Sequence, residues 1–302
     1  MRLSLIPPVL ALAWGLNWPA VKILLGALPP FTLRWVGLSL GALLLALIAL
    51  AQRKPLRLPR GAWPAVLVGG LLNVAVFNLS TAFAQLNTST SRAAVLTYTM
   101  PMMSAALAWW LLGERPDRRR ALALLFGMAG IALLAWPVLW GIEASGGAGR
   151  VPMLLGLMFP LLAALGWALG TVHSKRWPVA GSRIVVTAWQ LAVGAVCAGL
   201  GAGLAGERLP ASLSAPVALA LVFHVAIAMA LGYVLWFVLL ERSSATVSAL
   251  TTLMVPVVGV LGAMLLVGDR PSGLDGAGFV LVLAGAGLAM VGPGARPVPA
   301  RA

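Results

Sequence analysis

Long apolar segments recur along almost the whole chain and constrain its fold more than any other feature. Each run is bounded by charged residues, glycine or proline, and the linkers between the runs are short. A helix that crosses the hydrocarbon core of a bilayer needs about 20 mostly apolar residues. We therefore predict ten transmembrane helices, over residues 5–26, 30–51, 62–85, 91–112, 119–140, 152–172, 183–205, 215–240, 245–268 and 274–292.

The composition excludes a soluble domain. Of the 302 residues, 61% are hydrophobic and only 9% are charged, whereas a soluble domain carries roughly 25% charged residues. The net charge is +14, but the basic residues stand in short clusters between the apolar runs. That distribution is typical of membrane topology rather than of nucleic-acid binding. We therefore expect a multi-pass all-α protein in a lipid bilayer, with no nucleic-acid partner.

The basic residues also predict how the chain is oriented, because cytoplasmic loops of membrane proteins carry most of the lysine and arginine. If both termini face the cytoplasm, the main basic clusters, around Arg57, Arg119 and Arg176, fall on the cytoplasmic side. The opposite side then holds only Arg92, Arg150, Arg208 and Arg270, while Lys22 and Arg34 lie within predicted helices. We therefore predict that both termini are cytoplasmic.

A repeated motif indicates an internal duplication. LLGERP at 111–116 and LVGDRP at 266–271 share one pattern and lie 155 positions apart. At this offset residues 94–135 align with residues 249–290 without a gap, and several aligned residues are identical. Because each half holds five predicted helices, an odd number, the second repeat is expected to be inverted with respect to the first.

Inverted repeats are typical of transporters, in which two related halves exchange conformations around a site near the bilayer midplane. The predicted fold is therefore an all-α polytopic membrane protein with two inverted five-helix repeats around a central cavity. The alternative is a duplicated helix bundle without a transport role. The predicted units are residues 1–145 and 146–292, followed by a short cytoplasmic tail at 293–302.

Three stretches resemble a known family. WGLNWPAVK, residues 14–22, is similar to the first-helix signature of EamA-type members of the drug/metabolite transporter superfamily. The runs from Pro101 through LLGERP and from Pro256 through LVGDRP resemble the same family. The resemblance covers nearly the whole chain as two tandem repeats. Within the superfamily the chain is most similar to the YddG-type amino-acid exporters of the bacterial inner membrane.

The resemblance implies export of amino acids, aromatic and neutral ones included, and of related metabolites across the bacterial inner membrane, with no cofactor. The substrate class comes from the resemblance alone. The alternative is that the chain is another kind of efflux transporter of the same superfamily, for a different metabolite or a drug, with or without coupling to protons. The implied partners are a small-molecule substrate and the lipid bilayer, and a monomer is compatible with this prediction.

Polar residues form a stripe on the third predicted helix. Asn73, Phe77, Asn78, Thr81 and Gln85 share one face at 3.6 residues per turn. Lipid cannot satisfy such groups, so this face is expected to meet protein or water. The stripe indicates either the lining of a cavity or hydrogen bonds between helices.

Other helices add candidates of the same kind. Trp14, Asn17 and Trp18 share a face of the first helix, and Trp167 aligns with Trp14 in the second repeat. Tryptophan faces attract ammonium groups, although plain packing would explain either tryptophan alone. His224 aligns with Asn73 and is read as a hydrogen-bonding residue or a proton carrier. The predicted cavity residues are Asn17, Trp18, Asn73, Phe77, Asn78, Thr81, Thr97, Tyr98, Trp167, Thr171 and His224.

Proline occurs at matching places in the two repeats, at Pro101 and Pro256. Each removes a helical hydrogen bond and frees a carbonyl group near mid-span. Broken helices at corresponding positions of two halves are the best sequence indication of a transporter site. The alternative is that both prolines only bend their helices.

The acidic residues exclude several chemistries. All seven lie at or beyond the ends of the predicted helices, so no carboxylate is available at mid-membrane to carry a proton. We therefore predict facilitative movement rather than proton antiport. Two histidines and one cysteine predict no metal site. No mid-span nucleophile with a base and no HExxH motif is present, so we do not expect an enzyme.

Overall fold

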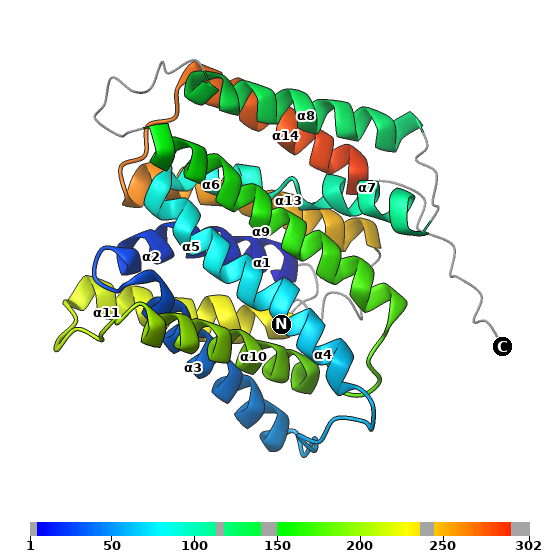
Figure 1. Cartoon of the computed structure of the whole chain (residues 1–302), viewed down its shortest axis with the longest axis vertical. Helices are drawn as coiled ribbons and strands as arrows, with labels where there is room; N and C mark the ends of the chain where they lie inside the picture. The colour runs from blue at the N-terminus through cyan, green and yellow to red at the C-terminus, as the bar shows by residue number, and fades with distance from the viewer. Residues whose placement is uncertain (1–4, 113–117, 140–149, 236–244, 291–302) are drawn as a thin grey trace.

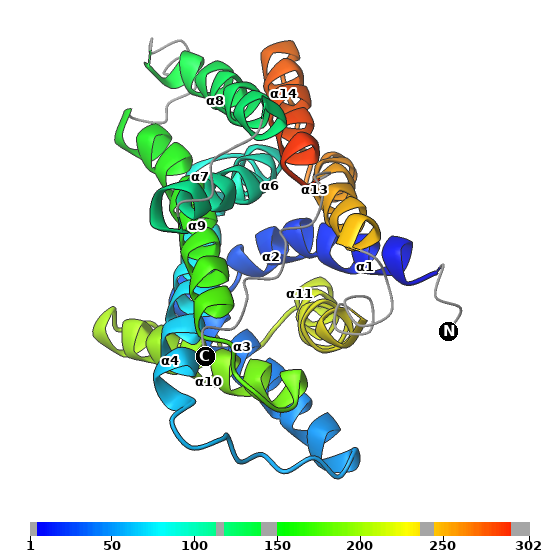
Figure 2. The same cartoon turned by 90° about the vertical axis from the view of Figure 1, so that its right-hand side faces the viewer.

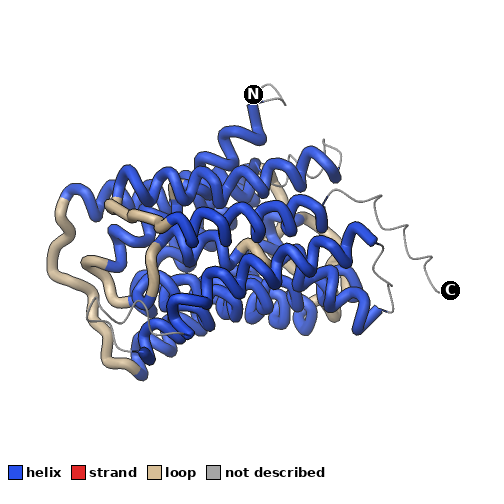
Figure 3. The backbone as a smooth tube through the Cα atoms, turned by 90° about the horizontal axis from the view of Figure 1, so that it is seen from above, coloured by secondary structure: helices blue, strands red, loops and turns tan. Residues whose placement is uncertain are grey.

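The computed structural model describes residues 5–112, 118–139, 150–235 and 245–290, and within these ranges every regular element is a helix (Figure 3). The predicted tail at 293–302 and the end of the LLGERP motif lie outside the described residues. The helices are α1 (Ile6–Gly15), α2 (Asn17–Leu25), α3 (Pro30–Ala51), α4 (Trp63–Gly69), η2 (Gly70–Val76), α5 (Phe77–Asn87), α6 (Thr90–Thr97), α7 (Met100–Leu112), α8 (Arg118–Leu139), α9 (Arg150–Arg176), α10 (Arg183–Leu204), α11 (Ala215–Val222), η4 (Phe223–Leu231), α13 (Ala245–Leu266) and α14 (Gly273–Met290).

Six helical segments are long and apolar enough to cross a membrane, judged by length and composition. They are Ile6–Leu25, Pro30–Ala51, Trp63–Asn87, Val151–Ser174, Arg183–Leu204 and Ala215–Leu235. Three further apolar helices are shorter: Ala121–Trp136, Met254–Leu266 and Gly273–Leu288. The all-helical architecture with membrane-spanning segments is therefore confirmed, and the count of ten spans stays a prediction.

Two of the predicted spans are interrupted near their middle. The first is divided at Leu16 into α1 and α2. Pro19 has no N–H to donate to the carbonyl of Gly15, and its ring crowds that carbonyl. The fourth predicted span is divided after Thr97 into α6 and α7, and Pro101 falls in the first turn of α7. The first N–H groups of a helix have no partner within the helix, so the proline costs no helical hydrogen bond at that position.

Two segments are wound as π-helix, η2 in the third predicted span and η4 in the eighth. Short π-helical segments are rare overall, and those that occur inside α-helices are often found at functional sites. The two segments contain Asn73 and His224, the pair that the internal repeat aligns. In contrast, α13 continues through Pro256 without an interruption.

The helices pack in pairs that join the two halves of the chain. α3 packs along α10 at the bottom of Figure 1, and α8 packs along α14 at the top. Between these pairs α1 contacts α13, while α9 contacts α5, η2 and α7. Figure 2 shows α9 on one side of the molecule and α1 and α13 on the other. The centre of the bundle is thus bounded by helices from both halves.

Carboxylates from the second half of the chain cap helices of the first half. The carboxylate of Asp269 accepts hydrogen bonds from the backbone N–H of Ser91, at 2.7 Å, and from its hydroxyl group, at 2.9 Å, in the first turn of α6. The carboxylate of Glu207 accepts a hydrogen bond from the backbone N–H of Thr32 at 2.7 Å, in the first turn of α3. Negative charge is favourable near a helix N-terminus. These contacts fasten the two halves to each other.

A buried ion pair makes a further connection between the halves. Arg92 donates from Nε and Nη2 to Oδ1 of Asp275, at 2.9 and 2.6 Å. Ser272 donates from its backbone N–H and its hydroxyl group to the other carboxylate oxygen, both at 2.9 Å. Both charged side chains are largely buried. Both carboxylate oxygens of Asp275 nevertheless accept hydrogen bonds, all of them from the protein.

We predict that Asp275→Ala lowers the free energy of unfolding by about 2 kcal/mol, because it removes several hydrogen bonds to a charged group at once. Arg270→Ala is the matched control, since Arg270 is exposed nearby, and it is expected to change stability by less than about 0.5 kcal/mol. Thermal unfolding of both variants in detergent measures the difference. Equal effects of the two substitutions would contradict the role given to the ion pair.

Candidate functional site

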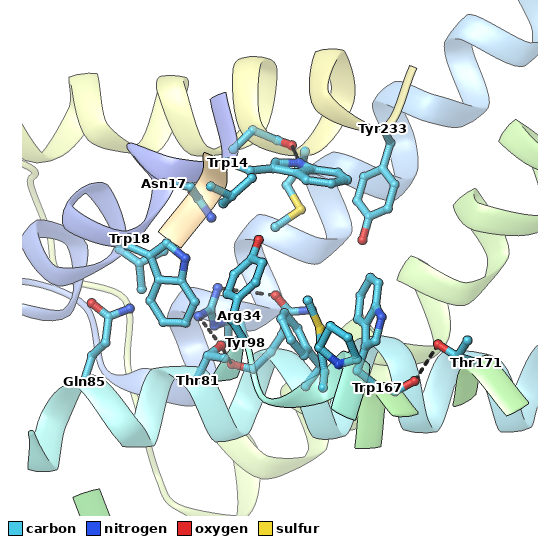
Figure 4. Close-up of a pocket in the computed structure, with 18 of the residues that line it drawn as sticks. Trp14, Asn17, Trp18, Arg34, Thr81, Gln85, Tyr98, Trp167, Thr171 and Tyr233 are labelled. Atoms are coloured by element: carbon cyan, nitrogen blue, oxygen red, sulfur yellow. Dashed lines mark hydrogen bonds between the residues drawn. The ribbon is translucent and has the colours of Figure 1, made fainter. Parts of the chain in front are cut away.

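A cavity of about 300 Å³ lies between helices of both halves (Figure 4). Its walls are mostly apolar and aromatic, with a few polar side chains, which is the usual composition of a small-molecule site. The lining residues are Trp14, Asn17, Trp18, Val21, Arg34, Phe77, Asn78, Thr81, Gln85, Tyr98, Met100, Pro101, Ser104, Trp167, Thr171, Ala228, Met229, Tyr233 and Val255.

Aromatic rings form much of the wall. The rings of Phe77 and Trp167 lie with their centroids 5.0 Å apart, and those of Trp14 and Tyr233 meet edge to face at 5.9 Å. Each of these two contacts joins the first half of the chain to the second. Aromatic faces can contact apolar side chains and can also attract a cation.

Trp14 is held in place by the backbone of η4. Its indole N–H donates to the carbonyl oxygen of Ala228 at 3.0 Å. Gly232 packs directly against the same ring: a Cβ atom at this position would lie 2.5 Å from the indole nitrogen. A larger side chain at position 232 would therefore displace the Trp14 ring from its present place in the cavity wall.

Arg34 projects from α3 into the cavity wall and is only 3% exposed. Its Nη2 donates to the hydroxyl oxygen of Thr81 at 3.0 Å, and its Nη1 donates to Oδ1 of Asn78 at 3.4 Å. Both acceptors are themselves oriented by α5 and η2. The Asn78 amide nitrogen donates to the carbonyl of Val74 at 3.0 Å, and the Thr81 hydroxyl donates to the carbonyl of Asn78 at 2.9 Å. The guanidinium group is thus held in one orientation.

Asn17 is positioned by a contact from η4. Nδ1 of His224 lies 2.7 Å from Oδ1 of Asn17, the geometry of a hydrogen bond in which the ring N–H donates to the amide oxygen. The amide nitrogen of Asn17 is then left to face the cavity, as Figure 4 shows. His224 is completely buried and acts on the cavity through Asn17.

Most of the residues predicted from the sequence line the cavity, and three of them lie behind its wall. Asn73 donates to the backbone carbonyl of Trp167 at 3.1 Å and so supports α9. Thr97 is fully buried and donates to the carbonyl of Ala93 at 2.8 Å. His224 is the third. The predicted residues in the lining are Asn17, Trp18, Phe77, Asn78, Thr81, Tyr98, Trp167 and Thr171, together with Pro101. Pro256 is not in the lining, although its neighbour Val255 is.

The sequence prediction omitted several lining residues. Arg34 was noted only as a basic residue within a predicted helix, although an ionisable group inside a membrane span is by itself a sign of function. Trp14 and Gln85 share faces with predicted site residues, so helical periodicity could have included them. Ser104 is polar and follows Thr97 and Pro101 at helical spacing, so the same periodicity could have included it. Met100 and Met229 carry no signal in the sequence, because nothing distinguishes them from other residues of apolar helices.

Comparison with known proteins gives a consistent result. The profile of the EamA-like transporter family matches the chain twice, over residues 8–136 and 154–291. The transporter YvbV of Bacillus subtilis is 29% identical, over 87% of this chain and 83% of its own length. A probable amino-acid metabolite efflux pump of Salmonella typhimurium is 28% identical, over 92% of this chain and 91% of its own length. A solved crystal structure superposes with a TM-score of 0.64 over 96% of both chains, at 23% identity, which is a likeness of fold alone.

We predict that Trp167→Ala weakens transport of an apolar substrate by about tenfold to a hundredfold. Removal of one aromatic wall takes away about 1.5–3 kcal/mol of apolar contact. Trp110→Ala is the matched control, because Trp110 is 80% exposed on the outside of α7. Initial flux into proteoliposomes, normalised to folded protein, is the measurement. If both substitutions reduce flux equally, the aromatic wall does not contact the substrate.

Proposed function

We propose that this chain, which belongs to the EamA-like transporter family, exports amino acids and related metabolites across the bacterial inner membrane. The observation that carries the proposal is the cavity, in which a buried cation and a few polar groups stand among aromatic side chains. Such a lining suits a molecule with one charged end and a neutral or aromatic side chain. The similarity to a protein described as a probable amino-acid metabolite efflux pump supports the same substrate class.

The size of the cavity also supports a small substrate. Its volume of about 300 Å³ is at the lower end of the range of ligand pockets, about 300–1,000 Å³. A single amino acid or a metabolite of similar size fits that volume, whereas a nucleotide sugar is large for it. Efflux of a different small metabolite is the alternative, and direct flux measurements distinguish the two.

For the whole molecule we propose ten transmembrane helices in two inverted repeats, residues 1–145 and 146–292, with both termini in the cytoplasm. Three observations support this arrangement. The family profile matches the chain twice. Helices at corresponding places of the two halves pack against each other, α3 on α10 and α8 on α14. The π-helical segments η2 and η4 occupy corresponding places as well.

Transport is proposed to occur by alternating access, through movement of one half against the other. The contacts of Asp269 with Ser91, and of Asp275 with Arg92, join the halves at one end of the bundle. They are hydrogen bonds and an ion pair rather than interdigitated apolar packing, so they can be exchanged for bonds to water when that end opens. We propose that they close the cavity toward the outside.

Movement is proposed to be facilitative, down the gradient of the substrate. None of the described residues that line the cavity is acidic, so the lining offers no carboxylate that could carry a proton. The acidic side chains of Glu207, Asp269 and Asp275 are engaged in helix caps and an ion pair. A zwitterionic substrate can be bound without a second ion.

We expect purified protein in liposomes to release preloaded L-phenylalanine with no ion gradient imposed. His224→Gln is expected to keep flux close to that of the wild type, because glutamine can still donate to Asn17 but cannot titrate. Release of radiolabelled substrate is the measurement. Uphill accumulation driven by a pH or sodium gradient alone would refute facilitative transport.

The orientation is tested separately, in a Cys197→Ser background. A cysteine in place of Arg57 should react with a membrane-impermeant thiol reagent only in opened cells. A cysteine in place of Arg208 should react in intact cells, and both positions are exposed. The reverse labelling pattern would show that the topology is opposite to the one proposed.

A further inference from the structure

Arg34 is the only charged side chain in the lining of the cavity, as far as the described residues show. Only 3% of its surface is exposed to solvent. A charged group within a membrane span is energetically costly, and such groups face a cavity or pair with other charges. A buried arginine with no counter-charge therefore calls for a specific explanation.

The protein itself supplies no counter-charge to Arg34 among the residues that the structure describes. Three acidic side chains are described, Glu207, Asp269 and Asp275, and each is bonded elsewhere. The partners of the guanidinium group are the neutral oxygens of Asn78 and Thr81. Its Nε is buried and has no hydrogen-bond partner. The arginine thus retains both unused donor capacity and an uncompensated charge.

We infer that Arg34 anchors a carboxylate group of the transported molecule, so that the substrate class is small carboxylates, amino acids among them, rather than amines or neutral drugs. This inference rests on the proposed transport function and specifies the chemistry of its site. Arginine presents several N–H donors in a planar fork that matches the two oxygens of a carboxylate. The incoming carboxylate would provide the missing negative charge.

The surroundings of Arg34 suit this role. Asn78 and Thr81 fix the orientation of the guanidinium group before a ligand arrives, which reduces the ordering that binding requires. Figure 4 shows Arg34 toward one end of the cavity and Trp167 and Tyr233 toward the other. A carboxylate on Arg34 leaves the rest of the molecule against aromatic rings. These rings can accommodate an apolar side chain or attract an ammonium group.

A purely structural role is the competing explanation, because Arg34 also ties α3 to α5. The two roles differ in what they do to substrate selectivity. Loss of a structural tie would reduce transport of every substrate in the same proportion. Loss of a carboxylate anchor would reduce transport of carboxylates and leave their neutralised analogues unaffected. The decisive quantity is therefore a ratio between matched substrates.

The experiment compares L-phenylalanine with L-phenylalaninamide, which lacks the carboxylate charge, in proteoliposomes containing the full chain. For the wild type we expect a KM for L-phenylalanine about tenfold or more below that for the amide. For Arg34→Gln we expect the KM for L-phenylalanine to rise by about tenfold to a hundredfold, the range for a lost hydrogen bond to a charged group, and the preference to disappear. Arg60→Gln, in an exposed loop, is the matched control and should behave as the wild type.

A second measurement needs no variant at Arg34 and so holds even if Arg34→Gln does not fold. Quenching of tryptophan fluorescence in wild-type protein should show 3-phenylpropionate binding about tenfold or more tighter than phenethylamine. Equal binding of the two, or an unchanged substrate ratio in folded Arg34→Gln, would overturn the inference. Amino-acid flux without carboxylate preference would leave the proposed function intact. Tight binding of 3-phenylpropionate without any amino-acid flux would contradict the proposed function alone.

Discussion

Within a bilayer every polar backbone group has to find its partner inside the protein, and this requirement governs the rest of the structure. It explains why the described chain is built from helices, in which each N–H and carbonyl is satisfied locally. Irregular backbone is tolerated at membrane depth only where it is buried in protein or lines a cavity. The interruption at Leu16 and the one after Thr97 both adjoin residues of the cavity wall. The departures from regular helix therefore gather where a ligand can be bound.

Charged side chains within a bilayer also need partners inside the protein. The described carboxylates lie at helix ends, where backbone N–H groups, hydroxyl groups or an arginine satisfy them. The one charged group in the cavity wall, among the described residues, is a cation that is oriented by neutral oxygens. This separation leaves a cavity with a cation in one part of its wall, and with aromatic, apolar and a few neutral polar side chains in the rest. In our proposal, the negative charge that balances Arg34 comes from the carboxylate of the substrate and not from a carboxylate of the protein.

Much of the fold and part of the site could be predicted from the sequence. Apolar runs of about 20 residues identify membrane helices, and the 3.6-residue period placed Asn78 and Thr81 on the cavity face. The same period placed Asn73 on that face too, but this residue supports α9 instead. At 3.6 residues per turn Asn73 stands at one edge of the stripe and Asn78 at the other, and α9 packs against the edge that carries Asn73. The contact between α9 and η2 is long-range, so the period of one helix does not predict it.

Long-range packing explains the remaining differences. Nothing in the local sequence indicates that His224 would reach Asn17 rather than the cavity, because that contact joins residues 207 positions apart. Arg34 could have been recognised from its place in an apolar run, yet its role depends on which helix faces it. The contacts with Asn78 and Thr81, far along the chain, are visible only in three dimensions.

A structure determined with bound L-phenylalanine tests the account most directly. The account predicts that the ligand occupies the cavity between the two halves, with its carboxylate within hydrogen-bonding distance of the Arg34 guanidinium group and its ring against the aromatic wall. A ligand bound outside this cavity, or one whose carboxylate points away from Arg34, would contradict it.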